Sequence, residues 1–228
     1  MGNAVMNKHM YRALITGGSR GIGKSVKELF VKHGIDVIAP GRKELDLADN
    51  ENIKQFVSGI LPVDILINCA GINNLASLEE MTPEMLQEMI QIDLTAQTLL
   101  LKYASAGMIK NNWGRVVNFS SIWSAFSKKR RIMYSLSKAG VNGLTTAAAV
   151  ELGQYNILVN AVAPGFVLTE LTYQNNTMEQ IKEISESVPV KRMAQPEEIA
   201  EFVYFLASPK NTFITGQTIF IDGGFSCV

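Results

Sequence analysis

The sequence contains few cysteines and few histidines. Of its 228 residues only two are cysteine, Cys69 and Cys227, and only two are histidine, His9 and His33. Two cysteines make no disulfide framework, which favours a reducing, cytoplasmic setting. Without a cluster of Cys or His side chains we expect no zinc site and no other metal.

Charge and hydropathy exclude further classes of protein. The 21 Lys+Arg balance the 21 Asp+Glu, so the formal net charge is zero. This argues against a nucleic-acid binder, because such proteins usually carry a basic surplus. Apolar residues make up 47% of the chain, too many for a disordered protein, yet no apolar run reaches the ~20 residues that span a membrane. We therefore expect a globular protein with neither nucleic acid nor membrane as a partner.

Short apolar runs alternate with stretches of helical periodicity. Strands are expected at Tyr11–Thr16, Asp36–Ala39, Val63–Asn68, Gly114–Ser120, Ile157–Val162 and Gln217–Ile221, with Leu45–Leu47 as a further candidate. Helices are expected at Gly21–His33, Asn50–Ser58, 83–110 (Thr82 as N-cap), Met133–Leu152 and Pro196–Ala207. Strands this apolar must be covered on both faces. The alternation predicts an α/β fold, a doubly wound, Rossmann-like parallel sheet in one domain over 11–228, after a disordered lead-in over 1–10.

A glycine-rich turn follows the first expected strand. Residues 16–23 read Thr-Gly-Gly-Ser-Arg-Gly-Ile-Gly, and glycines at 17, 21 and 23 let the backbone turn tightly and approach a pyrophosphate. The N-terminus of the following helix offers free N–H groups to such an anion. The spacing is not the generic G-x-G-x-x-G, so the turn alone is compatible with a dinucleotide site or with a plain tight turn.

Four further motifs follow the glycine turn in order. They are Asn-Cys-Ala-Gly at 68–71, Ser121 with Tyr134-x-x-x-Lys138, Pro164-Gly165, and Asp-Gly-Gly at 222–224. Over residues 11–225 the sequence resembles the short-chain dehydrogenase/reductase family, in its compact single-domain branch, and is similar to 3-oxoacyl-[acyl-carrier-protein] reductases. The resemblance implies a nicotinamide cofactor, hydride transfer to or from a carbonyl/alcohol substrate, and a homotetramer or homodimer.

The end of the second strand bears on cofactor choice. NAD enzymes of this fold place a carboxylate there for the ribose hydroxyls, but this chain has Gly41 followed by Arg42. Arg42 and Arg20 could bind a 2′-phosphate, each contact contributing ~1.5–3 kcal/mol, so NADP(H) is favoured over NAD(H). Alternatively, Arg42 is a solvated loop residue. The family's usual helix after this strand is missing before Asp46, so the adenosine side is expected to be open.

The resemblance places a series of cofactor contacts along the strand ends. Among them, Asp46 and Leu47 would flank the adenine, and Val167 and Thr169 would contact the nicotinamide carboxamide. The whole set is Gly17, Ser19, Arg20, Gly21, Ile22, Gly23, Arg42, Asp46, Leu47, Asn68, Ala70, Gly71, Tyr134, Lys138, Pro164, Gly165, Val167 and Thr169.

The candidate reaction centre is Ser121, Tyr134 and Lys138. Tyr134 and Lys138 lie four residues apart in a helix, so their side chains share one face. Tyrosine ordinarily titrates near pH ~10, and a neighbouring ammonium favours the phenolate. Tyr134 would exchange a proton with the substrate oxygen, and Ser121 would polarise that oxygen. The resemblance adds that Lys138 holds the nicotinamide ribose, and it favours Ser121 over the adjacent Ser120.

One position departs from the family pattern. The resemblance places an asparagine in the long helix, in a context such as IQxNLT, where its main-chain carbonyl helps to hold a water beside the lysine. This chain reads Ile-Gln-Ile-Asp-Leu-Thr at 90–95, which puts Asp93 there. A buried carboxylate near Lys138 would stabilise the lysine's charge. Asp93 is therefore a candidate catalytic residue; the alternative is a helix-kink residue without a catalytic part.

The loop before the tyrosine contains four consecutive cations at 128–131. Such a loop could receive an anionic substrate, and the alternatives are a solvated loop or a subunit contact. The candidate substrate contacts are Trp123, Lys128 and Tyr173, the last in an expected substrate lid over about residues 168–190.

Several functions stay open. In the 3-oxoacyl branch, arginines before the serine strand and after the tyrosine helix can receive the acidic carrier protein, but residues 110–113 and 154–156 here contain none. A nucleotide-sugar or other anionic-sugar oxidoreductase is an alternative. A non-catalytic NADP(H)-binding sensor is the alternative from another class. A nucleotide-sugar epimerase or dehydratase would need a C-terminal substrate domain, for which we expect no room in 228 residues.

Overall fold

Six parallel strands form one sheet in the order β2-β1-β3-β4-β5-β6. The computed structural model describes residues 10–228, so the expected lead-in over 1–10 lies, Met10 apart, outside the described residues. The strands are β1 (Arg12–Thr16), β2 (Asp36–Ile38), β3 (Ile65–Asn68), β4 (Gly114–Phe119), β5 (Ile157–Pro164) and β6 (Thr218–Ile221).

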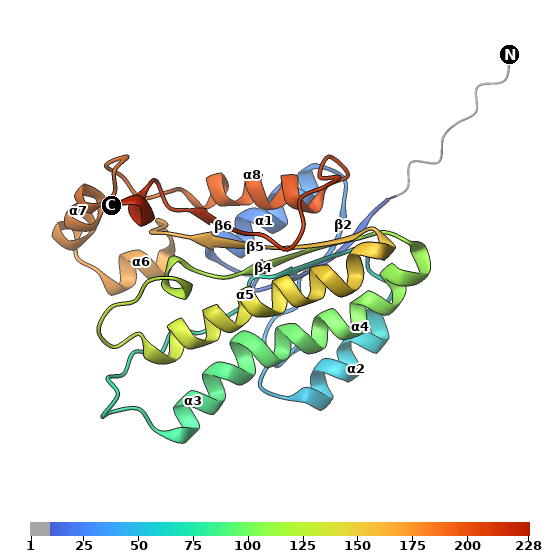
Figure 1. Ribbon diagram of the computed structural model, residues 1–228, viewed down its shortest axis with the longest axis horizontal. Coiled ribbons are helices and arrows are strands. Elements are labelled where there is room, and N and C mark those ends of the chain that lie inside the picture. Colours follow the sequence, from blue (N-terminus) through green and yellow to red (C-terminus); the bar gives the residue numbers. More distant parts are fainter. Residues whose placement is uncertain (1–9) are drawn as a thin grey trace, which may run out of the picture.

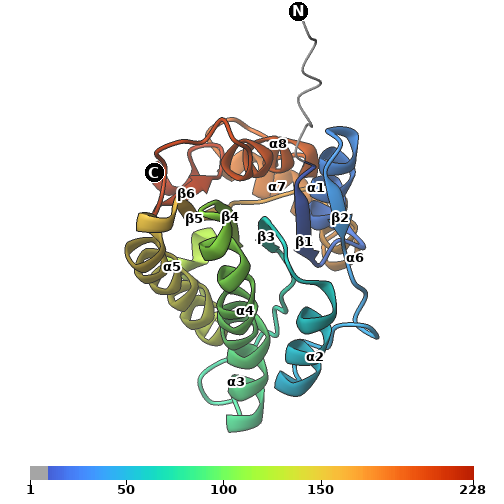
Figure 2. The same ribbon diagram turned by 90° about the vertical axis from the view of Figure 1, so that its right-hand side faces the viewer.

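Helices cover both faces of the sheet (Figures 1 and 2). They are α1 (Gly21–Lys32), α2 (Asn50–Ile60), α3 (Pro83–Ile90), α4 (Ala96–Asn111), α5 (Ile132–Leu152), α6 (Glu170–Asn175), α7 (Met178–Ser187) and α8 (Pro196–Ala207). In Figure 2, α1 and α8 lie above the sheet, and α2, α4 and α5 lie below it. The predicted doubly wound α/β fold is confirmed.

The strand register produces two separate cores. Leu14, Leu66 and Val116 are register partners across three strands, and all belong to the core shared with α2, α4 and α5. Their chain neighbours Ile15 and Ile67 face the other way, into the core beneath α1 and α8. Because side chains alternate along a strand, the continuous apolar runs of the sequence supply both faces at once.

The predicted strand at Leu45–Leu47 is wrong. Leu45 is buried in the core, but the segment pairs with no strand of the described sheet. A parallel neighbour would need a crossover of about a dozen residues after β2, and the few residues present form a turn in which Leu45 N donates to Gly41 O at 3.0 Å. Residues 39–49 contain no helix, and β2 is the edge strand of the described sheet.

The predicted helix over 83–110 is not continuous. Thr82 caps α3 as expected, accepting from Met85 N, but a π-helical turn, η1 (Gln91–Thr95), separates α3 from α4. A π turn inserts an extra residue and rotates the side chains that follow. This turn carries Asp93, whose side chain is fully buried.

A buried polar chain ties β3, β4 and α5 together. Asn68 Nδ2 donates to Asn118 Oδ1 at 2.9 Å, and Asn118 Nδ2 donates to Thr145 Oγ1 at 3.0 Å. The Thr145 hydroxyl in turn donates to Val141 O at 2.8 Å. Because all three side chains are inaccessible to solvent, each of these bonds replaces one that water can no longer supply.

The substitution Thr145→Ala tests this polar chain. It leaves the buried Asn118 amide without its acceptor, and we expect a loss of about 1–3 kcal/mol in the free energy of unfolding, measured in urea. Thr146→Ala is the matched control, because the exposed Thr146 hydroxyl bonds only within its own helix, and it should change stability by less than about 0.5 kcal/mol. Equal losses in the two variants would contradict the structural role of Asn118.

Candidate active site

The glycine turn lies where the strand order reverses. From β1 the chain places β2 on one side and β3 on the other, and in open α/β sheets the ligand-binding crevice lies at the carboxyl ends of the strands at such a point. Gly17 has φ +73°, and a Cβ there would lie 2.9 Å from the backbone of Ala70; a Cβ on Gly23 would lie 2.2 Å from Gly17 O. Thr16 Oγ1 accepts from the backbone N–H groups of Cys69 and Ala70, each at 3.1 Å. The turn and residues 69–71 therefore form one closely packed surface.

The adenosine side presents two free arginines. Arg20 at the start of α1 and Arg42 after β2 are exposed, and within residues 10–228 neither guanidinium has an ion pair or hydrogen bond. Glu44, which no sequence motif indicates, accepts a hydrogen bond from Gly41 N at 2.8 Å. The helix N-terminus, the close glycine backbone and the unpaired arginines fit a phosphorylated dinucleotide.

Lys138 is buried at the carboxyl end of β4. Its Nζ donates to Phe119 O at 3.1 Å and lies 3.1 Å from Asp93 Oδ2. The same Nζ is 5.5 Å from the centre of the Tyr134 ring. Lys138 is 4% exposed and Asp93 is 0% exposed, so this is a buried ion pair, which is stabilising only when its geometry is good.

Opposing effects set the charge of Lys138. Burial by itself lowers the pKa of Lys138, but the nearby Tyr134 and the carboxylate of Asp93 favour the ammonium, and the net pKa is raised. The lysine therefore keeps its positive charge over the physiological range.

Asp93 is fixed from two sides. Its Oδ1 accepts from Ile72 N at 2.8 Å. A Cβ on Gly71 would lie 3.1 Å from Asp93 Oδ1 and 3.3 Å from Lys138 Nζ. The ion pair thus lies directly beneath Gly71, which is exposed. A larger residue at this position would cover the pair and crowd whatever binds above it.

The two adjacent serines have different surroundings. Ser120 Oγ donates to Asn142 Oδ1 at 2.6 Å and holds the end of β4 against α5. Ser121 Oγ accepts from Trp123 N at 3.2 Å, and within residues 10–228 its hydroxyl proton has no acceptor. Ser121 is therefore the serine that can donate to a bound oxygen.

The remaining predicted contacts follow β1, β2 and β5. Gly165 N donates to Ile221 O, and Thr169 caps α6 with its methyl 3.4 Å from where a Gly21 Cβ would lie. Leu47 packs on the core instead of standing free. Ser19 is exposed. The ends of strands or helices carry or adjoin Ile22, Asp46, Pro164 and Val167. Of these four residues, Pro164 and Val167 are buried.

The basic loop does not act as one group. Arg130 pairs with Glu80 at 2.7 Å, whereas Lys128 and Arg131 lie 5.4 and 5.8 Å from the Trp123 ring centre. Tyr173 is exposed on α6, and nothing in residues 10–228 joins it to Trp123 by a hydrogen bond or ring contact.

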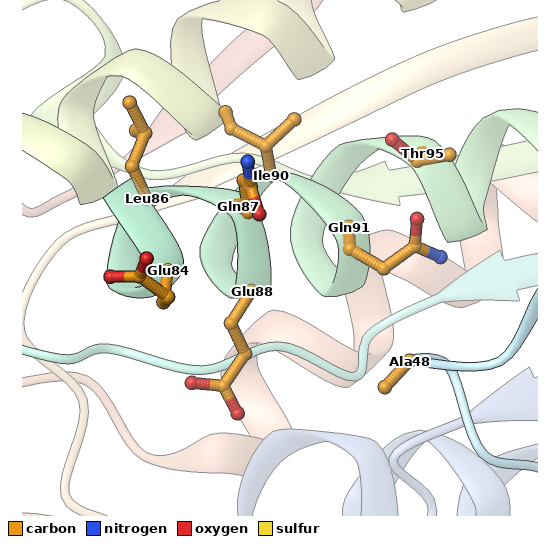
Figure 3. Close-up of a pocket in the computed structure, with 8 residues that line it drawn as sticks. All are labelled: Ala48, Glu84, Leu86, Gln87, Glu88, Ile90, Gln91 and Thr95. Carbon is orange, nitrogen blue, oxygen red and sulfur yellow. The ribbon is translucent and has the colours of Figure 1, made fainter. Parts of the chain in front are cut away.

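Two cavities lie away from this centre. One of about 680 Å³ lies between Ala48 and residues of α3 and η1, including Glu88 and Gln91 (Figure 3). Another of about 670 Å³ is lined by His33 and Tyr204 near the amino-terminal ends of the strands. Neither includes Ser121, Tyr134 or Lys138. Over residues 10–228 no helix is long and apolar enough to cross a membrane, and no three metal-ligating side chains gather.

Comparisons with known proteins agree with this geometry. A family model described as enoyl-(acyl carrier protein) reductase matches residues 19–226. A 3-oxoacyl-[acyl-carrier-protein] reductase FabG of Vibrio cholerae is 34% identical, in a match that covers 96% of this chain and 98% of the relative. The chain belongs to the short-chain dehydrogenase/reductase family.

Solved structures of short-chain dehydrogenases/reductases share the fold. A putative NAD(P)-dependent gluconate 5-dehydrogenase from Beutenbergia cavernae, with bound NADP, is 29% identical with a TM-score of 0.91, covering 96% of this chain and 97% of that one. A 4-hydroxyisoleucine dehydrogenase complexed with NADH is 26% identical, also with a TM-score of 0.91, covering 96% and 99%. As a short-chain dehydrogenase/reductase, the protein is an enzyme of the oxidoreductase class.

Proposed function

We propose that this protein is an NADP(H)-dependent oxidoreductase in which Tyr134 is the acid/base for a carbonyl/alcohol substrate. The observation that carries the proposal is the position of Lys138: a buried ammonium, 5.5 Å from the Tyr134 ring, at the crevice bounded by the glycine turn. When bound, NADP(H) supplies or accepts the hydride.

The side chains supply the proton chemistry. The ammonium of Lys138, beside the Tyr134 ring, stabilises the negative charge that develops on the tyrosine oxygen as its proton is transferred. In reduction Tyr134 gives its proton to the substrate oxygen, and in oxidation it takes the proton back. Ser121 donates a hydrogen bond to the same oxygen and stabilises its developing negative charge.

The cofactor is held by the surface of the glycine turn and strand ends. The α1 N-terminus and the turn receive the pyrophosphate, and Arg20 and Arg42 receive the 2′-phosphate. Gly71 allows the nicotinamide half to lie over the strand ends, with Lys138 hydrogen-bonding the ribose. The NADP-bound structural relative supports this preference, while the NADH-bound one shows that the fold also takes the other cofactor.

Asp93 acts through Lys138 as a positioning residue. Its carboxylate neutralises part of the buried charge and fixes Nζ beside Phe119 O. With two of the three ammonium donors committed, one remains for the ribose. The carboxylate takes over a task that a held water performs in the family pattern.

Two substrate classes have support. The FabG relatives support a 3-oxoacyl substrate, but the basic residues expected to receive a carrier protein are missing. The unpaired cations near Trp123, and similar structures named for gluconate and 4-hydroxyisoleucine, support an anionic substrate such as a sugar acid.

The setting and assembly complete the proposal. We place the enzyme in the cytoplasm. We also propose a homotetramer or homodimer, since exposed apolar side chains such as Leu136 and Val150 on α5 offer a contact surface. Residues 168–190, which contain α6 and α7, would close over the substrate as a lid.

Tyr134→Phe removes the proton donor. We expect kcat for NADPH-dependent ketone reduction to fall about 10²- to 10⁴-fold, with NADPH affinity, measured by fluorescence titration, changed less than about threefold. Tyr103→Phe on α4 is the control and should leave both quantities unchanged. Full turnover in Tyr134→Phe would overturn the acid/base role of Tyr134, whereas NADPH binding by the wild-type protein without turnover of any ketone would support the non-catalytic sensor.

Asp93→Asn tests the ion pair through pH. The carboxylate of Asp93 raises the pKa of Lys138, and burial lowers it. With a neutral amide in place of the carboxylate the pKa of Lys138 falls, so the ammonium loses its proton at a lower pH. The alkaline limb of kcat/KM should therefore move to lower pH, by roughly one pH unit. Asp49→Asn, at the exposed cap of α2, should not move it. An unshifted limb in Asp93→Asn would leave Asp93 with a purely structural role.

Arg20→Gln with Arg42→Gln tests cofactor choice. Losing two charged contacts of ~1.5–3 kcal/mol each should raise KM for NADPH by at least about tenfold, while KM for NADH stays within about threefold. Lys43→Gln serves as the control for surface charge. If NADH is the better cofactor for the wild-type enzyme, the roles of both arginines are wrong.

A further inference from the structure

The structure separates the four cations at 128–131 into two groups. Arg130 pairs with Glu80 at 2.7 Å, on the surface. Arg131 turns the other way: its guanidinium carbon lies 5.8 Å from the ring centres of both Trp123 and Tyr134. The two neighbouring arginines thus serve different surroundings, and only Arg131 faces the proposed proton donor.

Arg131 is half-buried without a counter-charge. Within residues 10–228 it has no ion pair; Nη1 donates to Asn73 Oδ1 at 2.7 Å, and Nε is shielded from solvent with no acceptor. Burial lowers the pKa of Arg131, opposed by the nearby Tyr134. A half-buried cation that leaves donors unused is costly unless a ligand supplies the acceptor.

A second cation lies over the same ring. Lys128 Nζ is 5.4 Å from the Trp123 ring centre, and burial followed by the charge of Arg131 lowers the pKa of Lys128. Two like charges beside one aromatic ring repel each other. The arrangement is relieved when an anion lies between them.

Two further aromatic rings pack on Trp123. Trp123 lies edge-to-face with Phe166 and Phe225, with ring centres 6.2 Å apart in both pairs, and Phe166 and Phe225 are 5.1 Å apart. Trp123 comes from η2 (Ile122–Ser124) after β4, Phe166 from the segment after β5, and Phe225 from the residues after β6. Together with Trp123 they form an aromatic wall beside the cations.

We propose that Arg131, with Lys128 beside it, binds a carboxylate on the substrate, so that the substrate is a short oxo acid or the corresponding hydroxy acid. The proposal rests on the proposed function and names its substrate class. The planar guanidinium matches a carboxylate. The Arg131 guanidinium lies beside the ring that carries the acid/base hydroxyl, so the carboxylate is separated from the reacting carbonyl by only a few bonds. The apolar remainder of the substrate then faces the aromatic wall.

Matched acids and esters test the charge directly. With saturating NADPH, we would compare 2-oxopentanoate with its ethyl ester, and 3-oxobutanoate with its ethyl ester. The wild-type enzyme should prefer each acid over its ester by at least about tenfold in kcat/KM. Equal or better turnover of the esters would overturn the proposal.

Arg131→Gln and Arg130→Gln form a matched pair. Arg131→Gln should lower kcat/KM for the acids about 10- to 100-fold, mainly through KM, and leave the esters within about threefold. Arg130→Gln removes the same charge one residue away and should change neither. A loss shared by acids and esters, or by both variants, would overturn the role of Arg131.

Binding without turnover separates this proposal from the proposed function. In a Trp113→Phe background, 2-oxopentanoate added to the NADP⁺ complex should change the fluorescence of Trp123 with saturation, and Arg131→Gln should weaken that binding at least about tenfold. If no ketone in the panel is reduced, the proposed hydride transfer is overturned, but this titration still tests the anion site. No saturable signal from the Arg131-containing protein would overturn it.

Discussion

The positive charge of Lys138, buried at the end of β4, is the constraint on which the rest of the site depends. An isolated ammonium at 4% exposure would lose its proton or destabilise the fold, so the chain must surround it with acceptors. Phe119 O comes from β4 and Asp93 from η1. The π turn is what brings Asp93 inward, and Gly71 leaves room above the pair. Sheet, helix break and loop are thus all shaped around one charge.

The same strand ends serve both halves of the site. Asn68 and Asn118 are hydrogen-bonded register neighbours that link β3 to β4 and, through Thr145, to α5. This holds α5, and with it Tyr134 and Lys138, against the sheet. The glycine turn packs on residues 69–71 just beyond β3. The proposed cofactor surface and the proposed acid/base residues therefore share a rigid base.

Charge is distributed unevenly over the crevice. Beneath Gly71, Lys138 is neutralised by Asp93, whereas Arg131 and Lys128 at Trp123, and Arg20 and Arg42 at the adenosine side, have no counter-ion in the described residues. The surface ion pair of Arg130 with Glu80 lies outside it. These unpaired cations lie where the proposed ligands would bring negative charge. A cation without a counter-ion contributes little to folding, but it can bind an anionic ligand.

Local pattern determined most of the fold and the identity of the candidate site residues. Apolar runs, caps such as Thr82 and the ordered motifs depend on neighbours in the chain, so they are readable from it. The sequence also singled out Asp93, but only tertiary structure decided its 3.1 Å ion pair, since the π turn depends on packing between helices. Likewise, Leu45–Leu47 has strand character but no crossover to reach a partner, and four adjacent cations look alike until folding turns Arg131 toward Tyr134 and Arg130 toward Glu80. Distances between residues remote in sequence are set by packing, and they decide which charges are paired.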